Sequence, residues 1–389
     1  MTTGNTIIIN SRRMSELDPK FVREITKFGA INFSACYNCG NCTAVCNLSE
    51  NQANFPRMFI RYGMTGQPEK ILSSKEIWLC YACGDCSESC PRQAFPGDYM
   101  AALRRYTIAK ADKTGLTRLL FTNNPFAILF TVLLACLLGS LVLTVKSDEA
   151  VARWLFTYIP YEVVHNIGLA VFILTGLTMV AGIVSFIRHI WNPGNIGSDG
   201  NKPVISWPKV VKALKKTGIE LAAMKRYQSC DKEDDSYWKH KPWLLKPWFV
   251  HWCIMWGFLG LLLATVLDFI FKNPATMMWL PSRLLGTLTG ILLMYGASIA
   301  ITYRLMKLTK TYSDGKLADW FFLVFLWIAG FTGFWLELAV IVNADTQLNQ
   351  IIFLIHTVIS MELVLLFAFS KFAHAVYRPL ALYLYFYHT

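Results

Sequence analysis

Six long apolar segments follow about residue 115, and each of them carries few charges. About twenty apolar residues are enough for a helix to cross the hydrocarbon core of a bilayer, where the backbone must satisfy its own hydrogen bonds. Tryptophan and tyrosine gather at the segment ends, as they do at membrane interfaces. We therefore predict six transmembrane helices, at residues 125–145, 163–187, 248–267, 284–303, 320–342 and 351–370.

Lysine and arginine are concentrated in every second connection between these segments. The connection of residues 189–247 holds many of them, and Arg304, Lys307, Lys310 and Lys316 follow the fourth segment. Because positive charge favours the cytoplasmic side, we expect a multi-pass protein of the inner (cytoplasmic) membrane with both termini in the cytoplasm. The net charge of +12 then reflects topology and a basic face toward anionic lipid, and we expect no nucleic-acid partner.

Eight of the eleven cysteines form two copies of the spacing C-x2-C-x2-C-x3-C, and Pro91 follows the second copy. This run is typical of [4Fe–4S] clusters, and in two-cluster ferredoxins the fourth cysteine of each run binds the other cluster. We therefore predict two [4Fe–4S] clusters. The first is assigned to Cys36, Cys39, Cys42 and Cys90, and the second to Cys80, Cys83, Cys86 and Cys46.

The alternatives for these cysteines are zinc sites and disulfides. Zinc sites usually show pairs of cysteines separated by a longer gap. Disulfides are disfavoured because no apolar signal peptide precedes the runs, so we expect a reducing compartment. The first run departs from the usual pattern, since Asn47 and not proline follows Cys46. Cys136 and Cys253 lie in apolar segments and Cys230 in a polar loop, and we assign none of them a role.

Histidines near the membrane are the next candidates, because ionisable residues in the bilayer are functional-site hypotheses by default. His356 and His374 are 18 residues apart. On one helix this spacing is five turns, so both would share a face about 27 Å apart along the axis. Since imidazole is an axial ligand of haem iron, the spacing suits two stacked haems. No C-x2-C-H motif is present, which favours b-type haem over covalent attachment.

Each haem needs a second imidazole at the same depth. We pair His165 with His356 at the outer side and His251 with His374 at the inner side. His189 is the alternative to His251, but it is 24 residues from His165, which places it about 36 Å away and too deep in the cytoplasm. Ordinary polar roles at the membrane interface remain the competing interpretation of all these histidines.

A quinone site needs a proton acceptor near a haem edge, and several carboxylates are candidates. They could equally be helix-end charges that pair with Arg283 or Lys272. The candidates are Glu162, Asp268 and Glu337 near the outer face, and Glu362 in the middle of a helix.

The predicted fold class is all-α. Residues 1–115 form a cytoplasmic, helical ferredoxin-type domain with two clusters, and residues 116–389 form a six-helix transmembrane cytochrome b domain. The basic loop 189–247 contains a predicted helix at 209–227. This helix lies on the membrane surface or on a partner, or the loop is a simple basic connector.

Over nearly its whole length the chain resembles the membrane subunits of the quinone-interacting membrane-bound oxidoreductase (Qmo) complexes of sulfate-reducing organisms. The paired cysteine runs resemble the small iron–sulfur subunit of heterodisulfide reductase. The membrane half, with His356 and His374 at their 18-residue spacing, resembles the cytochrome b (gamma) subunit of respiratory nitrate reductase. That subunit has two histidines ten residues apart on one helix, whereas here Leu261 lies ten residues after His251.

The resemblance implies a quinone-linked oxidoreductase subunit that transfers electrons but does not act on soluble substrates alone. It implies menaquinol as donor, two cytoplasmic flavin and iron–sulfur partner subunits, and adenylylsulfate reductase as eventual acceptor in dissimilatory sulfate reduction. Three alternatives stay open. The same quinol oxidation could serve a sulfite-reduction or heterodisulfide reductase-type complex, the chain could be a membrane redox sensor, or it could be a transporter with a ferredoxin appendage.

Overall fold

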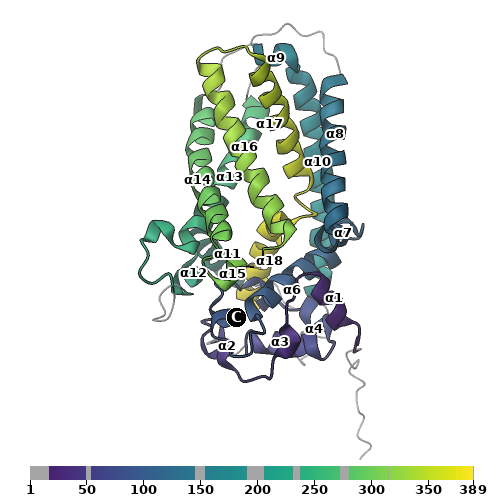
Figure 1. The fold of residues 1–389 in the computed structure, drawn as a ribbon, viewed down its shortest axis with the longest axis vertical. Coiled ribbons are helices and arrows are strands. Elements are labelled where there is room, and N and C mark those ends of the chain that lie inside the picture. The colour runs from purple at the N-terminus through teal and green to yellow at the C-terminus, as the bar shows by residue number, and fades with distance from the viewer. Residues whose placement is uncertain are drawn as a thin grey trace, which may run out of the picture.

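The computed structural model describes residues 17–49, 54–144, 154–190, 206–230, 237–271, 280–313 and 315–388. Within these ranges every regular element is helical, as the sequence predicts. Figure 1 shows a tall bundle of long helices that stands on a smaller N-terminal domain. We call the end of the bundle that carries this domain the near end, and the opposite end the far end.

Six helices of the bundle are long and apolar enough to cross a membrane, which confirms that prediction. Their predicted starts and ends agree with the observed ones to within five residues. Many of their leucines and isoleucines face outward, as a lipid-facing surface requires. The six helices are α8 (Asn124–Thr144), α10 (Tyr161–Ile190), α13 (Pro247–Phe271), α14 (Leu280–Leu305), α16 (Leu317–Ile341) and α17 (Gln347–Leu365).

The N-terminal domain is built from short helices around an aromatic core. Phe21 packs edge-on against Tyr106, and Phe33 stacks on Tyr99 with ring centroids 4.7 Å apart. The long helix α6 runs through this core and leads through α7 (Leu116–Thr122) into the bundle. The domain's elements are α1 (Phe21–Lys27), η1 (Phe33–Ala35), α2 (Asn41–Ala44), α3 (Arg57–Met64), α4 (Pro68–Leu72), η3 (Glu76–Trp78), α5 (Asp85–Glu88) and α6 (Pro96–Ala111).

The last membrane helix is shorter than the sequence predicts. α17 ends at Leu365, and after a turn the chain forms η6 (Lys371–Ala373) and then the separate helix α18 (His374–His388). The Ser370 side chain accepts a hydrogen bond from the backbone N–H of Phe372 and so caps a new helical start. His356 and His374 therefore lie on two different helices, and the expectation that they share one helical face is wrong.

Shorter helices surround the near end, and one, α9, lies at the far end (Figure 1). The predicted helix of the basic loop is present, but a left-handed residue at Met224 divides it into α11 and α12. α11 packs along α18 and so lies on the protein itself. The remaining elements are α9 (Trp154–Tyr158), α11 (Trp207–Ala223), α12 (Lys225–Cys230), η5 (Trp243–Leu245) and α15 (Lys310–Ser313).

One hydrophobic core joins the N-terminal domain to the bundle. Trp78 contacts Phe186 of α10 and Tyr377 of α18, with ring centroids 5.4 and 5.9 Å away. A Cβ atom at Gly182 would lie 2.3 Å from the Tyr377 hydroxyl, so this close approach requires glycine. The packing fixes the cysteine-rich domain directly against the near end of the membrane helices.

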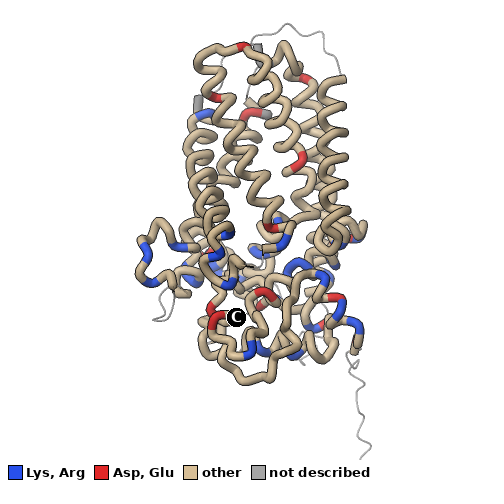
Figure 2. The backbone as a smooth tube through the Cα atoms, in the orientation of Figure 1, with Lys and Arg blue, Asp and Glu red and all other residues tan. Residues whose placement is uncertain are grey.

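Charge is distributed unevenly along the bundle axis. Figure 2 shows that most lysine and arginine lies at the near end and over the N-terminal domain. Asp319, near the start of α16, is buried between two of these cations: its carboxylate is 2.6 Å from Lys371 Nζ and 3.5 Å from Arg105 Nη1. Since Arg105 belongs to α6, this ion pair is a second tie between the two parts of the chain.

Candidate metal centres

The two cysteine runs adopt the same backbone conformation. Asn38 and Ala82, each two residues after the first cysteine of its run, have positive φ angles of 67° and 56°. Gly40 and Gly84, each after the second cysteine, have φ angles of 96° and 99°. Left-handed residues at these matched places curl each run into a tight loop, which turns several cysteines toward one centre.

Backbone N–H groups point at the cysteine sulfur atoms. The N–H of Asn38 donates to Cys36 Sγ at 3.4 Å, and the N–H of Ala82 donates to Cys80 Sγ at 3.3 Å. Cys90 Sγ accepts from a third backbone N–H, 3.4 Å away. Hydrogen bonds to sulfur stabilise thiolates and are one of the factors that set the potential of an iron–sulfur cluster.

The neighbours of Cys42 agree with the crossed assignment. Burial, followed by the thiols of Cys36, Cys39 and Cys90, raises the pKa of Cys42 to about 11. These are the four cysteines assigned to the first cluster. Such crowding disfavours free thiolates and is relieved when a metal takes the protons' place.

Thiol pKa values are also raised among the cysteines assigned to the second cluster. Burial raises the pKa of Cys46 to about 12, with Cys80 among the neighbouring charges. Burial, then Cys80 and Cys46, and then Cys42 of the first group raise the pKa of Cys86 far above its usual value. Cys46, from the first run, thus lies among the cysteines of the second run, and the residues present fit two four-cysteine centres.

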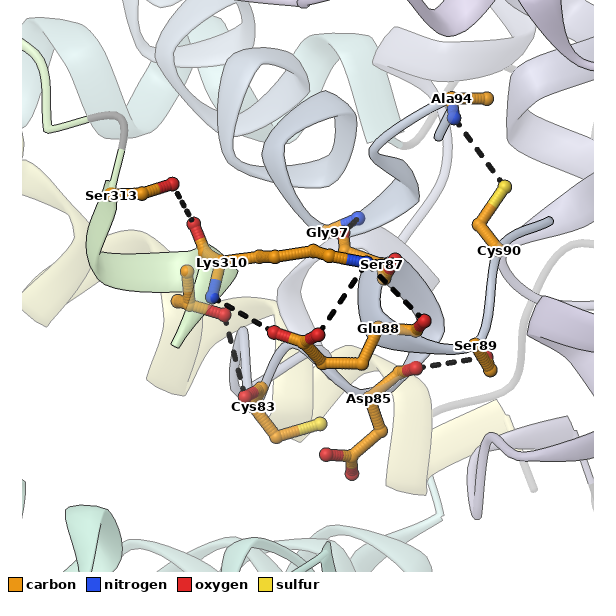
Figure 3. Close-up of polar contacts among 11 residues, drawn as sticks. Cys83, Asp85, Ser87, Glu88, Ser89, Cys90, Ala94, Gly97, Lys310 and Ser313 are labelled. Atoms are coloured by element: carbon orange, nitrogen blue, oxygen red, sulfur yellow. Dashed lines mark hydrogen bonds and ion pairs between the residues drawn. The ribbon is translucent and has the colours of Figure 1, made fainter. Parts of the chain in front are cut away.

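A loop of the membrane half covers the second centre from one side. The backbone N–H of Lys310 in α15 donates to Glu88 Oε1 at 2.8 Å, and its Nζ lies 3.5 Å from Glu88 Oε2. Thr311 donates to the carbonyl oxygen of Cys83 at 3.5 Å. In Figure 3, Lys310 lies across Ser87 and Glu88, while the sulfur of Cys83 points to the opposite side of the loop.

Aromatic rings cover the second centre from another side. Tyr81, next to Cys80 in the chain, stacks on Tyr227 of α12 with ring centroids 4.8 Å apart. Its hydroxyl donates to Glu220 of α11 at 2.6 Å, and the Arg378 guanidinium lies 3.7 Å from its ring centroid. Burial raises the pKa of Tyr81 well above its usual value, so the hydroxyl keeps its proton.

The inner histidine pair lies just beyond these rings. His251, in the first turns of α13, has its ring centroid 6.4 Å from that of His374 and 6.3 Å from that of Tyr227. Two metal–nitrogen bonds of about 2 Å each would place ring centroids roughly 6 Å apart, so one ion fits between the imidazoles. Although the argument from a shared helix failed, the chain still brings these two histidines together.

Hydrogen bonding around the pair also suits metal ligands. The Nδ1–H of His374 donates to the carbonyl oxygen of Lys371 at 2.5 Å, which leaves Nε2 as the free ligand atom. Burial lowers the pKa of His374 to about 4, so the imidazole is neutral, as metal binding requires. Nδ1 of His251 is buried without a hydrogen-bond partner. His374 therefore makes the hydrogen bond that usually orients a metal-binding imidazole, whereas His251 makes none through Nδ1.

The other histidines lie apart from this pair. His356 is nine residues inside α17, and its Nδ1 lies 3.0 Å from Thr332 Oγ1 of α16. His165 is only four residues inside α10 and contacts Tyr161 of the same helix. Their expected equal depth and their pairing stay predictions. His189 lies beside Lys110 and Lys113 of the N-terminal domain.

The predicted quinone carboxylates mostly have ordinary partners at the far end. Glu337 accepts hydrogen bonds from Arg283 Nε at 3.2 Å and from Thr287 at 2.9 Å. Asp268 accepts a hydrogen bond from Ser282, and Glu162 lies in the first turn of α10. Glu362 differs, because it is only 1% exposed and its Oε1 has no hydrogen-bond partner.

Sequence reasoning missed an apolar crevice near the inner pair, because its walls come from three separate parts of the chain. The crevice lies between α7 and α8, the start of α16, and the turn after α17. Its wall is unusually aromatic, since six phenylalanines contribute to it. They are Phe121, Phe321, Phe322, Phe325, Phe369 and Phe372.

Comparison with known proteins also divides the chain between the cysteine-rich N-terminal domain and the membrane helices. A family model described as a 4Fe-4S dicluster domain matches residues 32–94, and one described as citrate utilization protein B matches residues 118–385. This second family is unrelated to the gamma subunit of nitrate reductase, so the resemblance expected for the membrane half is wrong. No solved structure matches the chain.

Several curated relatives match the N-terminal domain alone. An iron–sulfur subunit of the CoB–CoM heterodisulfide reductase of Methanopyrus kandleri is 28% identical over 106 residues, which is 25% of this chain and 55% of that protein. A subunit of the H(2):CoB-CoM heterodisulfide,ferredoxin reductase of Methanothermobacter marburgensis is 31% identical over 102 residues, 26% of this chain and 55% of that protein. The chain thus spans about half the length of the curated relatives it matches.

Proposed function

The chain belongs to the citrate utilization protein B family through residues 118–385, and from this and its dicluster domain we propose that it carries electrons between a membrane quinone pool and a cytoplasmic partner. Its relatives are oxidoreductase subunits, which supports a redox role for the chain. Concentration of positive charge at the near end supports a cytoplasmic position for the dicluster domain. The quinone is proposed to be menaquinol.

A continuous row of rings carries the proposal. It runs from His374 to His251, Tyr227 and Tyr81, with successive centroid distances of 6.4, 6.3 and 4.8 Å, and Tyr81 directly follows Cys80. Electron tunnelling weakens exponentially with distance, so a closely packed path between two metal centres favours rapid transfer. This row links the inner histidine pair to the second cluster.

The proposed cofactors are two [4Fe–4S] clusters and b-type haem. A haem held by two imidazoles supplies one-electron redox chemistry at the membrane. His251 and His374 would hold it at the near end, with the carbonyl of Lys371 fixing the tautomer of His374. A second haem on His165 and His356 remains part of the proposal.

The aromatic crevice is proposed as the quinone site. A menaquinone ring and its isoprenoid tail are almost entirely apolar, and the crevice wall offers phenylalanine rings to pack against them. Phe372 of this wall is two residues from His374, so a quinone bound there would lie beside the inner pair. The far-end carboxylates Asp268 and Glu337 are then structural, because both already have partners.

The finer assignment is the membrane subunit of a quinone-interacting membrane-bound oxidoreductase (Qmo) complex, with two cytoplasmic flavin and iron–sulfur subunits and adenylylsulfate reductase as acceptor. The similarity of the first domain to subunits of heterodisulfide reductases supports a partner of that general kind. A second candidate follows from the family name, which points to a partner that acts on citrate or a similar carboxylate. Co-purification of the chain with its natural partners separates these possibilities.

The test is haem content and quinol reduction of the purified, detergent-solubilised chain. We expect a b-type spectrum and reduction of haem and clusters by a menaquinol analogue. His251→Ala and His374→Ala should each abolish the same haem signal, whereas His189→Ala should keep it. A haem-free wild-type protein, or unchanged haem content in His251→Ala, would overturn the proposal.

A further inference from the structure

A ninth cysteine lies beside the second cluster site, and it comes from the membrane half of the chain. Cys230 ends α12, far outside the matched dicluster domain. Its Sγ, the Sγ of Cys83 and a carboxylate oxygen of Asp85 all lie within 4.8 Å of one another.

The end of α12 is also fastened to the first cysteine run. Asn47, which follows Cys46, donates from Nδ2 to Ser229 Oγ at 3.2 Å. Asn47 stands where the second run has Pro91, so this departure from the usual motif has a structural role. Cys230 thus lies close to Cys83 of the second run. It is also tied to Cys46 of the first run, because the residue after Cys46, Asn47, bonds the residue before Cys230.

We propose that Cys230 is a positioning residue for the second cluster, which donates its S–H to the Cys83 sulfur and so sets the cluster's reduction potential. Four thiolates are already assigned to each cluster, so the site is complete without Cys230 as a ligand. The proposal rests on the dicluster assignment but not on the quinone or haem chemistry.

The donor is available for this role. The thiol of Cys230 now donates to the backbone carbonyl of Arg226 at 3.5 Å, which is a weak hydrogen bond. An iron-bound thiolate carries negative charge and is a stronger acceptor than a carbonyl oxygen, so the S–H should turn toward Cys83. Cys83 lies at the loop that α15 covers from the other side, which leaves the α12 side as the approach to its sulfur.

The direction of the effect follows from charge. Reduction adds one negative charge to the cluster and its thiolates, so a hydrogen bond to sulfur stabilises the reduced form more than the oxidised form. Cys230 should therefore raise the reduction potential of the second cluster and leave the first one unchanged. A segment of the membrane half would in this way control how readily the cluster accepts electrons.

The experiment is a mediated redox titration of the purified whole chain with dithionite, followed by paramagnetic resonance. Cys230→Ala should shift the midpoint potential of one cluster downward, and Cys230→Ser, which keeps a hydroxyl donor, should restore part of the shift. The shifted signal should be the one that Cys83→Ser removes. Cys136→Ala, which changes an exposed cysteine on the membrane surface of α8, is the matched control and should change neither potential.

Iron and acid-labile sulfide are measured on the same samples. Unchanged potentials in Cys230→Ala would overturn the proposal. Loss of one cluster's iron and sulfide in Cys230→Ala would also overturn it, because Cys230 would then hold the cluster and not tune it. Since dithionite replaces quinol as reductant, failure of the proposed quinone chemistry would leave this result unaffected.

Discussion

The contact between α15 and the second cysteine loop gives the sharpest test of the fold. Gly84 has a φ angle of 99°, and a Cβ atom there would lie 1.9 Å from Thr311 Oγ1. Gly40 is its equivalent in the first loop, with a φ angle of 96°, but the nearest atom to its Cβ would be the end of the Arg57 side chain at 3.1 Å. Alanine at either place meets the same backbone strain, and only Gly84→Ala must also displace α15.

The free-energy cost of each alanine substitution follows from the backbone strain and, at Gly84, from the lost contacts of α15. A left-handed backbone costs a residue with a Cβ about 1–2 kcal/mol, which raises the population of the locally opened state by a factor of about 5–30. Displacing α15 also removes the half-exposed contacts of Lys310 with Glu88, worth about 1 kcal/mol after solvent screening. We therefore expect Gly84→Ala to be the more damaging change by about a factor of five.

The assay is the rate at which an iron chelator removes each cluster, followed by paramagnetic resonance. Gly40→Ala should speed loss of the first cluster, and Gly84→Ala should speed loss of the second by a larger factor. Thr311→Ala, combined with Gly84→Ala, should return that rate to the Gly40→Ala level. If the double variant loses its cluster as fast as Gly84→Ala alone, α15 does not hold this loop.

Two further predictions concern the ligands and the far-end carboxylates. Cys83→Ser should remove one [4Fe–4S] signal while haem absorbance persists, and a protein that contains zinc but no acid-labile sulfide would refute the cluster assignment. Glu337→Gln should lower thermal stability by no more than about 1 kcal/mol, because its pair with Arg283 is partly exposed, and should leave quinol oxidation at the wild-type rate. A large loss of quinol oxidation would restore Glu337 as a quinone-site residue.

Local sequence signals predicted much of the fold. Apolar length was enough to locate all six membrane helices, because a bilayer leaves the backbone few alternatives. The prediction from apolar length failed at the end of the sixth helix, α17, because residues 366–370 are as apolar as the helix before them. The chain turns there because Ser370 caps a new helix and Lys371 binds Asp319, which belongs to another helix. Neither contact is visible in local composition.

The candidate site divides in the same way. The cysteine runs carry their own spacing and needed no tertiary information. The residues that surround the second cysteine run could be found only from tertiary structure. In the sequence, Tyr81 and Tyr227 looked like ordinary aromatic residues, and Cys230 looked like a lone cysteine in a polar loop. Only the fold places all three beside the cysteines of the second run. The pair His251 and His374 was found from membrane depth, although the helical argument for His374 was wrong.

Electron passage along the row of rings is the central claim, and rapid mixing tests it most directly. The purified chain is mixed with a menaquinol analogue, and haem and cluster reduction are followed by absorbance and freeze-quench paramagnetic resonance. In Tyr227→Leu we expect haem reduction at the wild-type rate and markedly slower reduction of the second cluster. Tyr295→Leu, which changes a tyrosine of α14 outside this path, should behave as wild type. Equal cluster reduction in Tyr227→Leu and wild type, or clusters that quinol never reduces, would contradict the account.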